Sequence, residues 1–373
     1  MELGIMFFAS GGAGRESGKY RLLLEAAQIA DRNGLSAVWT PERHFHSFGG
    51  LFPNPAVLGA ALAPLTDRIQ IRAGSLISPL HHTLRIAEEW SVVDNLSGGR
   101  AAISFGSGWN VDDFLFFPER YRRRQACMYE QIELVRRLWR GEELIEANSF
   151  GKPVRVSLYP QPIQPELPVW VTSSGNAETF VSAGRAGANV LTHLIGQDIP
   201  ALAEKIERYR AALRESHGPA ARGKVSLMLH TFVGADLEAV RSKVRTPYRE
   251  YLRSAVRLEQ LAAEGGGTIS GGHRVAPHQI PTGTFEELLD LAYERYLETG
   301  SLIGTPDRCL RMVERFEAIG VDEIACLIDF VDDPEAVLES LGSLCEVSAV
   351  CADAGADPGE DLSVAYFLED IEA

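Results

Sequence analysis

The sequence predicts an α/β protein whose alternating strands and helices form a TIM-type (β/α)₈ barrel. Short β-branched or apolar runs alternate with longer runs of helical period along nearly the whole chain, the pattern of βα units in a parallel sheet. Eight such short runs occur, and eight strands with following helices are the barrel count. No G-x-G-x-x-G follows the first run, which disfavours a doubly wound open sheet.

The expected elements follow from these two periodicities. Strands are predicted at residues 3–8, 35–39, 69–74, 100–106, 168–173, 188–192, 225–233 and 322–328. Helices are predicted at residues 20–33, 83–97, 122–140, 176–186, 198–216, 236–262, 284–299, 306–319 and 334–347. The second of these helices ends at Gly98, a residue type that adopts the left-handed cap without a Cβ penalty.

Two segments interrupt the alternation. Residues 144–160 predict an insertion hairpin before strand five, turning near Gly151. Residues 247–305 are longer than a crossover needs and contain glycine runs. They predict a long insertion after strand seven, whose Gly-rich part at 260–283 closes as a lid over the barrel mouth, where barrel enzymes have their sites. A solvated surface excursion is the alternative.

The acidic charge is concentrated at one end of the chain. The formal net charge is −15, the last basic residue is Arg315, and residues 316–373 hold sixteen Asp or Glu. The preceding residues, with 36 basic and 35 acidic side chains, are near neutral, which disfavours binding to nucleic acid or to an anionic membrane. We assign residues 1–349 to a single barrel domain and residues 350–373 to an acidic C-terminal tail.

The five cysteines form no C-x-x-C pair and have no histidine at zinc spacing, so we expect reduced thiols and no metal site. The short apolar run at the N-terminus has no basic residues before it, and no stretch of 18 apolar residues occurs. A cytoplasmic location is therefore expected.

The exit of strand five predicts an anion site. Ser173, Ser174 and Gly175 lead directly into a helix that begins near Asn176. Backbone N–H groups, the positive end of the helix dipole and two hydroxyls then point the same way, as in phosphate sites. Simple N-capping by Ser or Asn is the alternative, but it explains one of these residues rather than the cluster.

Other strand exits offer candidates for holding a planar ligand. Gly74, Gly106 and Gly108 allow close approach to the backbone, or else relieve bends at the barrel rim. Trp109 and the Phe7-Phe8 pair either form a wall against a ring system or belong to the core. The remaining polar candidates at strand exits are Ser75, Ser107, Asn110 and Thr192.

His44 lies in a dense polar run at the exit of strand two. A neutral imidazole there could donate a hydrogen bond or move a proton near neutral pH; a structural histidine is the alternative. The basic run at 120–124 is interpreted as a solvated helix start, with a docking patch for an acidic carrier protein as the alternative.

These strand exits resemble those of the bacterial luciferase-like flavin monooxygenases, from Leu3 to the last helix. The resemblance is carried by WTPERHF and the following FPNP, by the stretch at 78–100, and by VTSSGNAETF at 171–180. The runs FGSGWN, NVLTHLIGQD and GTPDRCLRM are similar to the branch associated with nonribosomal peptide and polyketide biosynthesis.

The resemblance implies a barrel that holds reduced FMN at its mouth and uses O₂ to oxidise, typically to hydroxylate, a natural-product intermediate, free or bound to a carrier protein. It implies a strained, often cis, peptide at Gly74-Ser75 and the FMN phosphate at Ser173 and Ser174. His44 and Arg43 are the catalytic candidates, with His44 preferred as the one that faces the flavin. The implied cofactor-binding residues are Phe8, Gly74, Ser75, Ser107, Trp109, Asn110, Ser173, Ser174, Gly175 and Thr192.

The sequence also departs from that family. Luciferases carry a His-His pair where Arg43 and His44 stand, and a phosphate-gripping Arg where Ser107 stands. Light emission is therefore not expected, and other groups must anchor the phosphate. No nicotinamide fingerprint is present, which implies a separate flavin reductase, and family habit implies a dimer or tetramer. A deazaflavin-dependent hydride-transfer enzyme and a flavin-binding barrel without catalysis are the alternatives.

Overall fold

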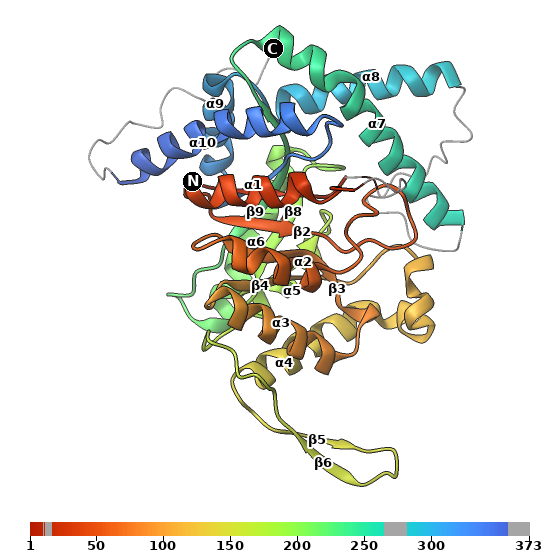
Figure 1. The fold of residues 1–373 in the computed structure, drawn as a ribbon. Helices are drawn as coiled ribbons and strands as arrows, with labels where there is room; N and C mark the ends of the chain where they lie inside the picture. Colours follow the sequence, from red (N-terminus) through yellow and green to blue (C-terminus); the bar gives the residue numbers. More distant parts are fainter. Residues whose placement is uncertain (10, 12–16, 265–281, 357–373) are drawn as a thin grey trace.

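The computed structural model describes residues 1–9, 11, 17–264 and 282–356 (Figure 1). Its centre is a closed ring of eight parallel strands, in the order β11-β1-β2-β3-β4-β7-β8-β9, with β9 pairing back to β11. The predicted (β/α)₈ barrel is confirmed. The strands are β1 (Glu2–Met6), β2 (Ala37–Thr40), β3 (Gln70–Ile77), β4 (Ala101–Gly106), β7 (Val169–Ser173), β8 (Asn189–His193), β9 (Val225–Val233) and β11 (Glu323–Leu327).

Helices surround this ring (Figure 1). They are α1 (Arg21–Arg32), α2 (Pro55–Leu62), α3 (Thr83–Ser97), α4 (Arg124–Trp139), α5 (Ala177–Arg185), α6 (Ile199–His217), α7 (Leu237–Glu264), α8 (Thr282–Thr299), α9 (Pro306–Ala318) and α10 (Pro334–Ala356). None of the helices in the described ranges combines the length and apolar character needed to span a bilayer. The five cysteines are all buried, and none lies in a disulfide in this structure.

Two elements escaped the sequence prediction. Helix α2 is short and apolar around most of its circumference, so it shows no amphipathic period; Asn54 caps it by accepting from the N–H groups of Ala56 and Val57. Strand β10 (Ser301–Gly304) is a four-residue addition outside the ring. It pairs with the C-terminal half of the nine-residue strand β9, from His230, the last residue of β9 that pairs with β11.

Both predicted insertions begin where expected. The hairpin before the fifth barrel strand is formed by β5 (Leu144–Ala147) and β6 (Pro153–Val156), and it projects away from the barrel (Figure 1). After β9, the described part of the long insertion forms α7 and α8. Most of the Gly-rich segment predicted as a lid, at 265–281, lies outside the described residues. Helix α10 continues to Ala356, past the predicted start of the tail, and the rest of that tail also lies outside the described residues.

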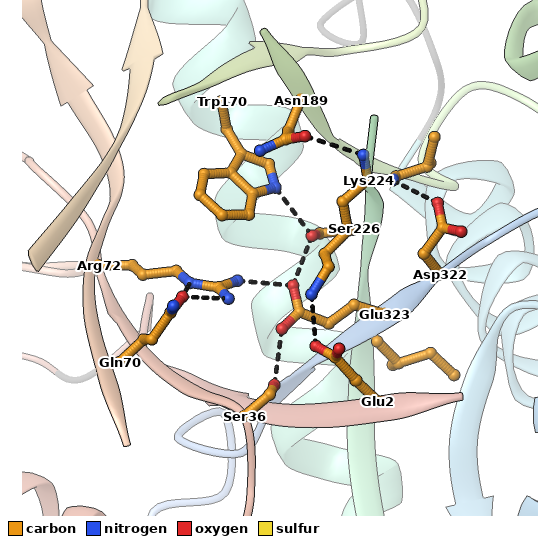
Figure 2. A network of polar contacts seen from close by, with 12 residues as sticks. Glu2, Ser36, Gln70, Arg72, Trp170, Asn189, Lys224, Ser226, Asp322 and Glu323 are labelled. Atoms are coloured by element: carbon orange, nitrogen blue, oxygen red, sulfur yellow. Dashed lines mark hydrogen bonds and ion pairs between the residues drawn. The ribbon is translucent and has the colours of Figure 1, made fainter. Parts of the chain in front are cut away.

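A polar network centred on a buried ion pair lies at the N-terminal end of the barrel (Figure 2). The Arg72 guanidinium donates to Glu323 Oε2 at 2.6 Å, and Ser226 and Ser36 donate to the same carboxylate. The Trp39 and Trp170 rings flank the guanidinium at 4.6 and 4.3 Å. Barrel enzymes have their sites at the opposite, C-terminal mouth, so a ligand site is expected there.

Candidate active site

A cavity of about 260 Å³ lies inside the C-terminal mouth of the barrel. Its walls come from the exits of β1, β2, β3, β4, β7, β8 and β9, and from α7. The apolar part of the wall is formed by Met6, Phe8, Phe48, Ile77, Leu191, Ile195, Met228 and Tyr251. The polar part is formed by Glu42, Arg43, Ser75, Ser107, Thr172, Ser174, Thr192 and His193. The shape and chemistry suit a flat, largely apolar ligand with polar edges.

A chain of three hydroxyls connects neighbouring strands at the base of this cavity. Thr172 Oγ1 lies 2.6 Å from Ser75 Oγ and 2.7 Å from Ser104 Oγ. The Gly74-Ser75 peptide is cis, as the resemblance implied. A Cβ at Gly74 would lie 2.9 Å from the Trp39 ring, so packing inside the barrel already requires glycine here, whether or not a ligand approaches.

A second cavity, of about 210 Å³, adjoins the first. The two share Ser107, Gly108, Trp109, Thr172 and Ser174. The second is lined further by residues from the starts of α4 and α5, namely Arg124, Gln125, Met128, Tyr129, Ser173, Asn176, Glu178, Thr179 and Ser182. One elongated site therefore has an apolar end in the barrel and a polar end at the first turn of α5, where N–H groups favour an anion.

Arg124 supplies the positive charge of this polar end. Its Nε donates to the Gly108 carbonyl oxygen at 2.8 Å, and its Nη1 donates to the Tyr121 carbonyl oxygen at 3.1 Å. These bonds hold the guanidinium beside the strand-four loop. Burial raises the pKa of the nearby Tyr129 hydroxyl to about 12, so this phenol is a neutral donor at physiological pH. The two side chains can together donate to a phosphate.

The basic run at 120–124 is thus not simply a solvated helix start. Arg120 donates to the carbonyl oxygens of Pro79 and His81, at 3.2 and 2.6 Å, and Arg124 lines the second cavity. Only Arg122 and Arg123 are exposed, and Arg123 pairs with Glu130. Of the four arginines, Arg124 therefore lines the site and Arg120 holds the segment that carries His81.

Most predicted cofactor residues are gathered by the fold. Phe8, Gly74, Ser75, Ser107, Trp109, Ser174 and Thr192 line the first cavity, and Ser173 lines the second. Within the described chain, Asn110 and Gly175 lie outside both cavities. Asn110 Nδ2 instead donates to Asp113 Oδ1 at 2.7 Å, which shapes the turn into the short helix η3 (Asp112–Phe116). Gly175 has φ +100 and provides the turn before α5, which Asn176 caps.

The structure places Arg43, rather than His44, against the cavity. The Arg43 guanidinium lies 4.4 Å from the Phe8 ring centroid and 5.1 Å from that of Phe48. Burial lowers the pKa of Arg43, although Tyr251, Asp113 and Asp329 act in the opposite direction. The guanidinium nevertheless remains charged. This order is the reverse of the preference drawn from the sequence.

His44 belongs to a cluster centred on Glu42. His44 Nε2 lies 2.7 Å, and His81 Nε2 2.6 Å, from Glu42 Oε1. The Ile77 N–H donates to Glu42 Oε2 at 2.7 Å. The His44 ring contacts the Phe116 ring edge-on, with 5.0 Å between centroids. His44 therefore sits at the rim, one side chain away from the cavity.

Two further titratable groups border the site. Burial lowers the pKa of His193, which lines the first cavity, to about 4, so its imidazole is neutral. Burial raises the pKa of Asp113 to about 6, although His44, Asn110 and Arg43 oppose that rise. Across the described ranges, no group of three or more His, Cys, Asp or Glu is arranged to hold a metal ion.

Several residues of this site were not selected from the sequence. They are Glu42, His81, Asp113, Arg124, Tyr129, Thr172, His193 and Tyr251. Glu42 and Arg124 stand inside runs that the sequence singled out, and His81 stands inside the stretch at 78–100 that carries the resemblance. Tyr251 lies on a long helix, and only the packing of α7 over the barrel mouth reveals its role.

Comparison with known proteins agrees with this architecture. The family model described as luciferase-like monooxygenase matches residues 1–323. The oxygenase component of the flavin-dependent trigonelline monooxygenase of Acinetobacter baylyi is 26% identical over 321 residues, which cover 83% of each chain. The F420-dependent glucose-6-phosphate dehydrogenase of Amycolatopsis mediterranei is 31% identical over 176 residues, which cover 45% of this chain and 51% of that protein.

Among solved structures, the oxygenating constituent of the 3,6-diketocamphane monooxygenase of Pseudomonas putida, in complex with FMN, shares the fold. It has a TM-score of 0.73 at 18% identity and covers 94% of this chain and 98% of its own. Since the family model spans well over half of the sequence, the chain belongs to the luciferase-like monooxygenase family.

Proposed function

We propose that this protein is the oxygenase of a two-component FMN-dependent monooxygenase, which receives reduced FMN from a separate flavin reductase and uses O₂. The observation that carries the proposal is the joining of an apolar cavity in the barrel mouth to a polar cavity that holds Arg124 at the start of α5. The similarity to the oxygenase component of a flavin-dependent monooxygenase and to an FMN-bound monooxygenase supports it.

FMN fits these residues in both parts of the site. The first cavity offers apolar walls and a row of hydroxyls to a flat ring with polar edges. The second offers Arg124, the neutral Tyr129 hydroxyl, Ser173, Ser174 and the first turn of α5 to a phosphate. When bound, reduced FMN supplies the electrons with which O₂ is activated for transfer of one oxygen atom to a substrate.

The protein's own side chains then orient the reactants and exclude water. Phe8, Phe48 and Tyr251 form an aromatic cover beside Arg43, with ring centroids 5.4 to 6.3 Å apart. Arg43 places a positive charge where negative charge develops. The neutral His193 imidazole accepts from the Ile195 N–H through Nδ1, so its Nε2–H can donate a hydrogen bond. His44 can exchange a proton at the rim.

Rapid mixing tests the proposal directly. The protein with one equivalent of FMN is photoreduced without oxygen and then mixed with oxygenated buffer while the flavin spectrum is recorded. We expect a transient flavin spectrum that free reduced FMN does not give under the same conditions. Failure to bind FMN, or reoxidation identical to that of free reduced FMN, would contradict the proposal.

A deazaflavin-dependent hydride transfer is the second candidate, because of the partial match to an F420-dependent dehydrogenase. The two candidates differ in their need for oxygen. An F420 enzyme turns over its substrate anaerobically and binds F420 more tightly than FMN, whereas an oxygenase requires O₂. Parallel titrations with FMN and F420 separate them.

The substrate we propose is an apolar natural-product intermediate, free or bound to a carrier protein. The runs FGSGWN, NVLTHLIGQD and GTPDRCLRM support this assignment. An exposed apolar rim, formed by Phe45, Leu115 and Phe116 beside His44, also supports it. Acyl groups offered as free acids and as pantetheine thioesters would distinguish the free from the carrier-bound form. A cytoplasmic homo-oligomer, a dimer or tetramer, completes the proposal.

A further inference from the structure

Glu42 joins two histidines through one carboxylate oxygen. Its side chain is fully buried at the exit of β2, whereas those of His44 and His81 are 8% and 19% exposed. Both imidazoles place Nε2 within 2.7 Å of Glu42 Oε1, and the Ile77 N–H occupies Oε2. Three donors around one buried carboxylate are a satisfied arrangement, which fixes the carboxylate in place.

The charge state of Glu42 determines the proton positions. Burial disfavours the charged carboxylate, but the hydrogen bonds from His44 and His81 outweigh it and lower the pKa of Glu42. An ionised carboxylate only accepts hydrogen bonds, so each Nε2 that touches it carries a proton. In His44 this leaves Nδ1 as the nitrogen that can take up a proton. In His81 the Glu42 contact outweighs burial and raises the pKa.

We propose that Glu42 is a positioning residue that fixes the Nε2–H tautomer of His44, so that Nδ1 is the nitrogen that exchanges a proton during the reaction. His81 holds Glu42 through the same carboxylate oxygen. This inference rests on the proposed function, in which His44 exchanges a proton at the rim of the cavity. A carboxylate that orients a histidine in this way is a recurring device in catalytic triads and around metal ligands.

The surroundings support a positioning role. The His81 carbonyl oxygen accepts from Arg120 Nη1 at 2.6 Å and from Gln131 Nε2 at 3.0 Å, so the second histidine is anchored through its backbone. The other charged groups facing the cluster are Arg43 and Asp113 around His44, and Glu89 of α3 near His81. Among the described residues, Glu42 is the only carboxylate within hydrogen-bond distance of His44 Nε2.

The test measures the tautomer of His44 directly. Protein labelled with nitrogen-15 histidine is studied by NMR without cofactor, and the His44 signals among the nine histidines are assigned with His44→Asn. In wild type, we expect Nε2 to be protonated. In Glu42→Gln, whose amide can donate, that tautomer should be lost, and Glu42→Asp, which keeps the charge, should restore it in part. His82→Asn is the matched control, because His82 is the neighbouring exposed cap of α3.

The second readout is the rate at which protein-bound reduced FMN is reoxidised by O₂ alone. Glu42→Gln should change this rate in the same direction as His44→Ala, by roughly 100-fold or less, the lower end for loss of a general acid or base. The double variant should add little to either single change. His82→Asn should match wild type in both measurements.

The outcomes separate this inference from the proposed function. Retention of the Nε2–H tautomer in Glu42→Gln overturns the inference, whatever the kinetics. Loss of the tautomer with altered reoxidation supports it. Loss of the tautomer with a wild-type reoxidation rate overturns the claim that Glu42 acts in the reaction through His44. If His44→Ala then also reoxidises at the wild-type rate, the proposed role of His44 fails as well. FMN titration and circular dichroism of each variant identify any loss of folding.

Discussion

The Arg124 guanidinium donates to the carbonyl oxygen of Gly108 at 2.8 Å and so brings a positive charge from the start of α4 to the loop after β4. In the related luciferases the phosphate-gripping arginine stands at the strand-four exit itself, where this chain has Ser107. The structure thus provides an arginine at the same end of the site from a different element.

Replacement of Arg124 by Gln should weaken FMN binding by roughly 10- to 100-fold, as expected for losing a hydrogen bond to a charged group, about 1.5–3 kcal/mol. Riboflavin, which lacks the phosphate, should lose little affinity. Fluorescence titrations with both flavins measure the difference, and Arg122→Gln, an exposed member of the same run, is the control. Equal losses for FMN and riboflavin would show that Arg124 acts only through the Gly108 loop.

Asp113 should give the protein a pH-dependent stability. Burial raises its pKa from 3.8 to about 6. Between these two values the folded protein keeps a proton that the unfolded chain releases, so the Asp113 contribution to the free energy of unfolding decreases as pH rises. Asp113→Asn removes this contribution. In urea unfolding at about pH 4 and about pH 7, the free energy of unfolding of the variant should exceed that of wild type by more at the higher pH. An equal difference at both pH values would refute the burial of Asp113.

The barrel and its hairpin were predictable because strands, helices and turns leave local patterns in the sequence. Contacts between distant residues leave no such pattern. The Asp94 side chain, for example, accepts from the N–H groups of Ile163 and Gln164, about 70 residues away. Glu42 and His81 are likewise separated by 39 residues, and only the parallel pairing of β2 with β3 brings their exits together. Ser173 and Ser174 were recognisable because the helix start that they serve follows in sequence.

Phe45 provides a test of backbone strain at the rim. Its φ is +58, in the left-handed region, and its side chain is 63% exposed. The ring stacks on Phe116 with 5.7 Å between centroids. Both Phe45→Gly and Phe45→Ala remove the ring. Only the glycine relieves the backbone strain, because alanine still has a Cβ. We expect the Gly variant to be more stable than the Ala variant by about 1 kcal/mol, measured by urea unfolding; the reverse order would contradict the strain.

The buried pair of Arg72 and Glu323 should respond differently to single and double substitution. Glu323→Gln leaves the guanidinium without its charged partner inside the barrel, and we expect a loss of about 3–5 kcal/mol in the free energy of unfolding. Arg72→Met combined with Glu323→Leu removes both charges, so the double variant should be more stable than either single one. Chemical unfolding of wild type, Arg72→Met, Glu323→Leu and the double variant completes the cycle, and Glu323→Gln is measured beside them.

The same pair also predicts the effect of acid. Burial disfavours the Glu323 carboxylate, but Arg72 and the hydroxyls of Ser226 and Ser36 outweigh it and lower its pKa below 4.5. The stabilisation is therefore fully present above the unfolded value of 4.5 and is lost as pH falls through the lower, folded value. The deficit of Glu323→Gln relative to wild type should accordingly shrink in acid. Only an ionised Glu323 loses its attraction to Arg72 when it is protonated. A stability difference between Glu323→Gln and wild type that stays constant down to the acid unfolding transition would therefore mean that Glu323 is not ionised in the folded protein.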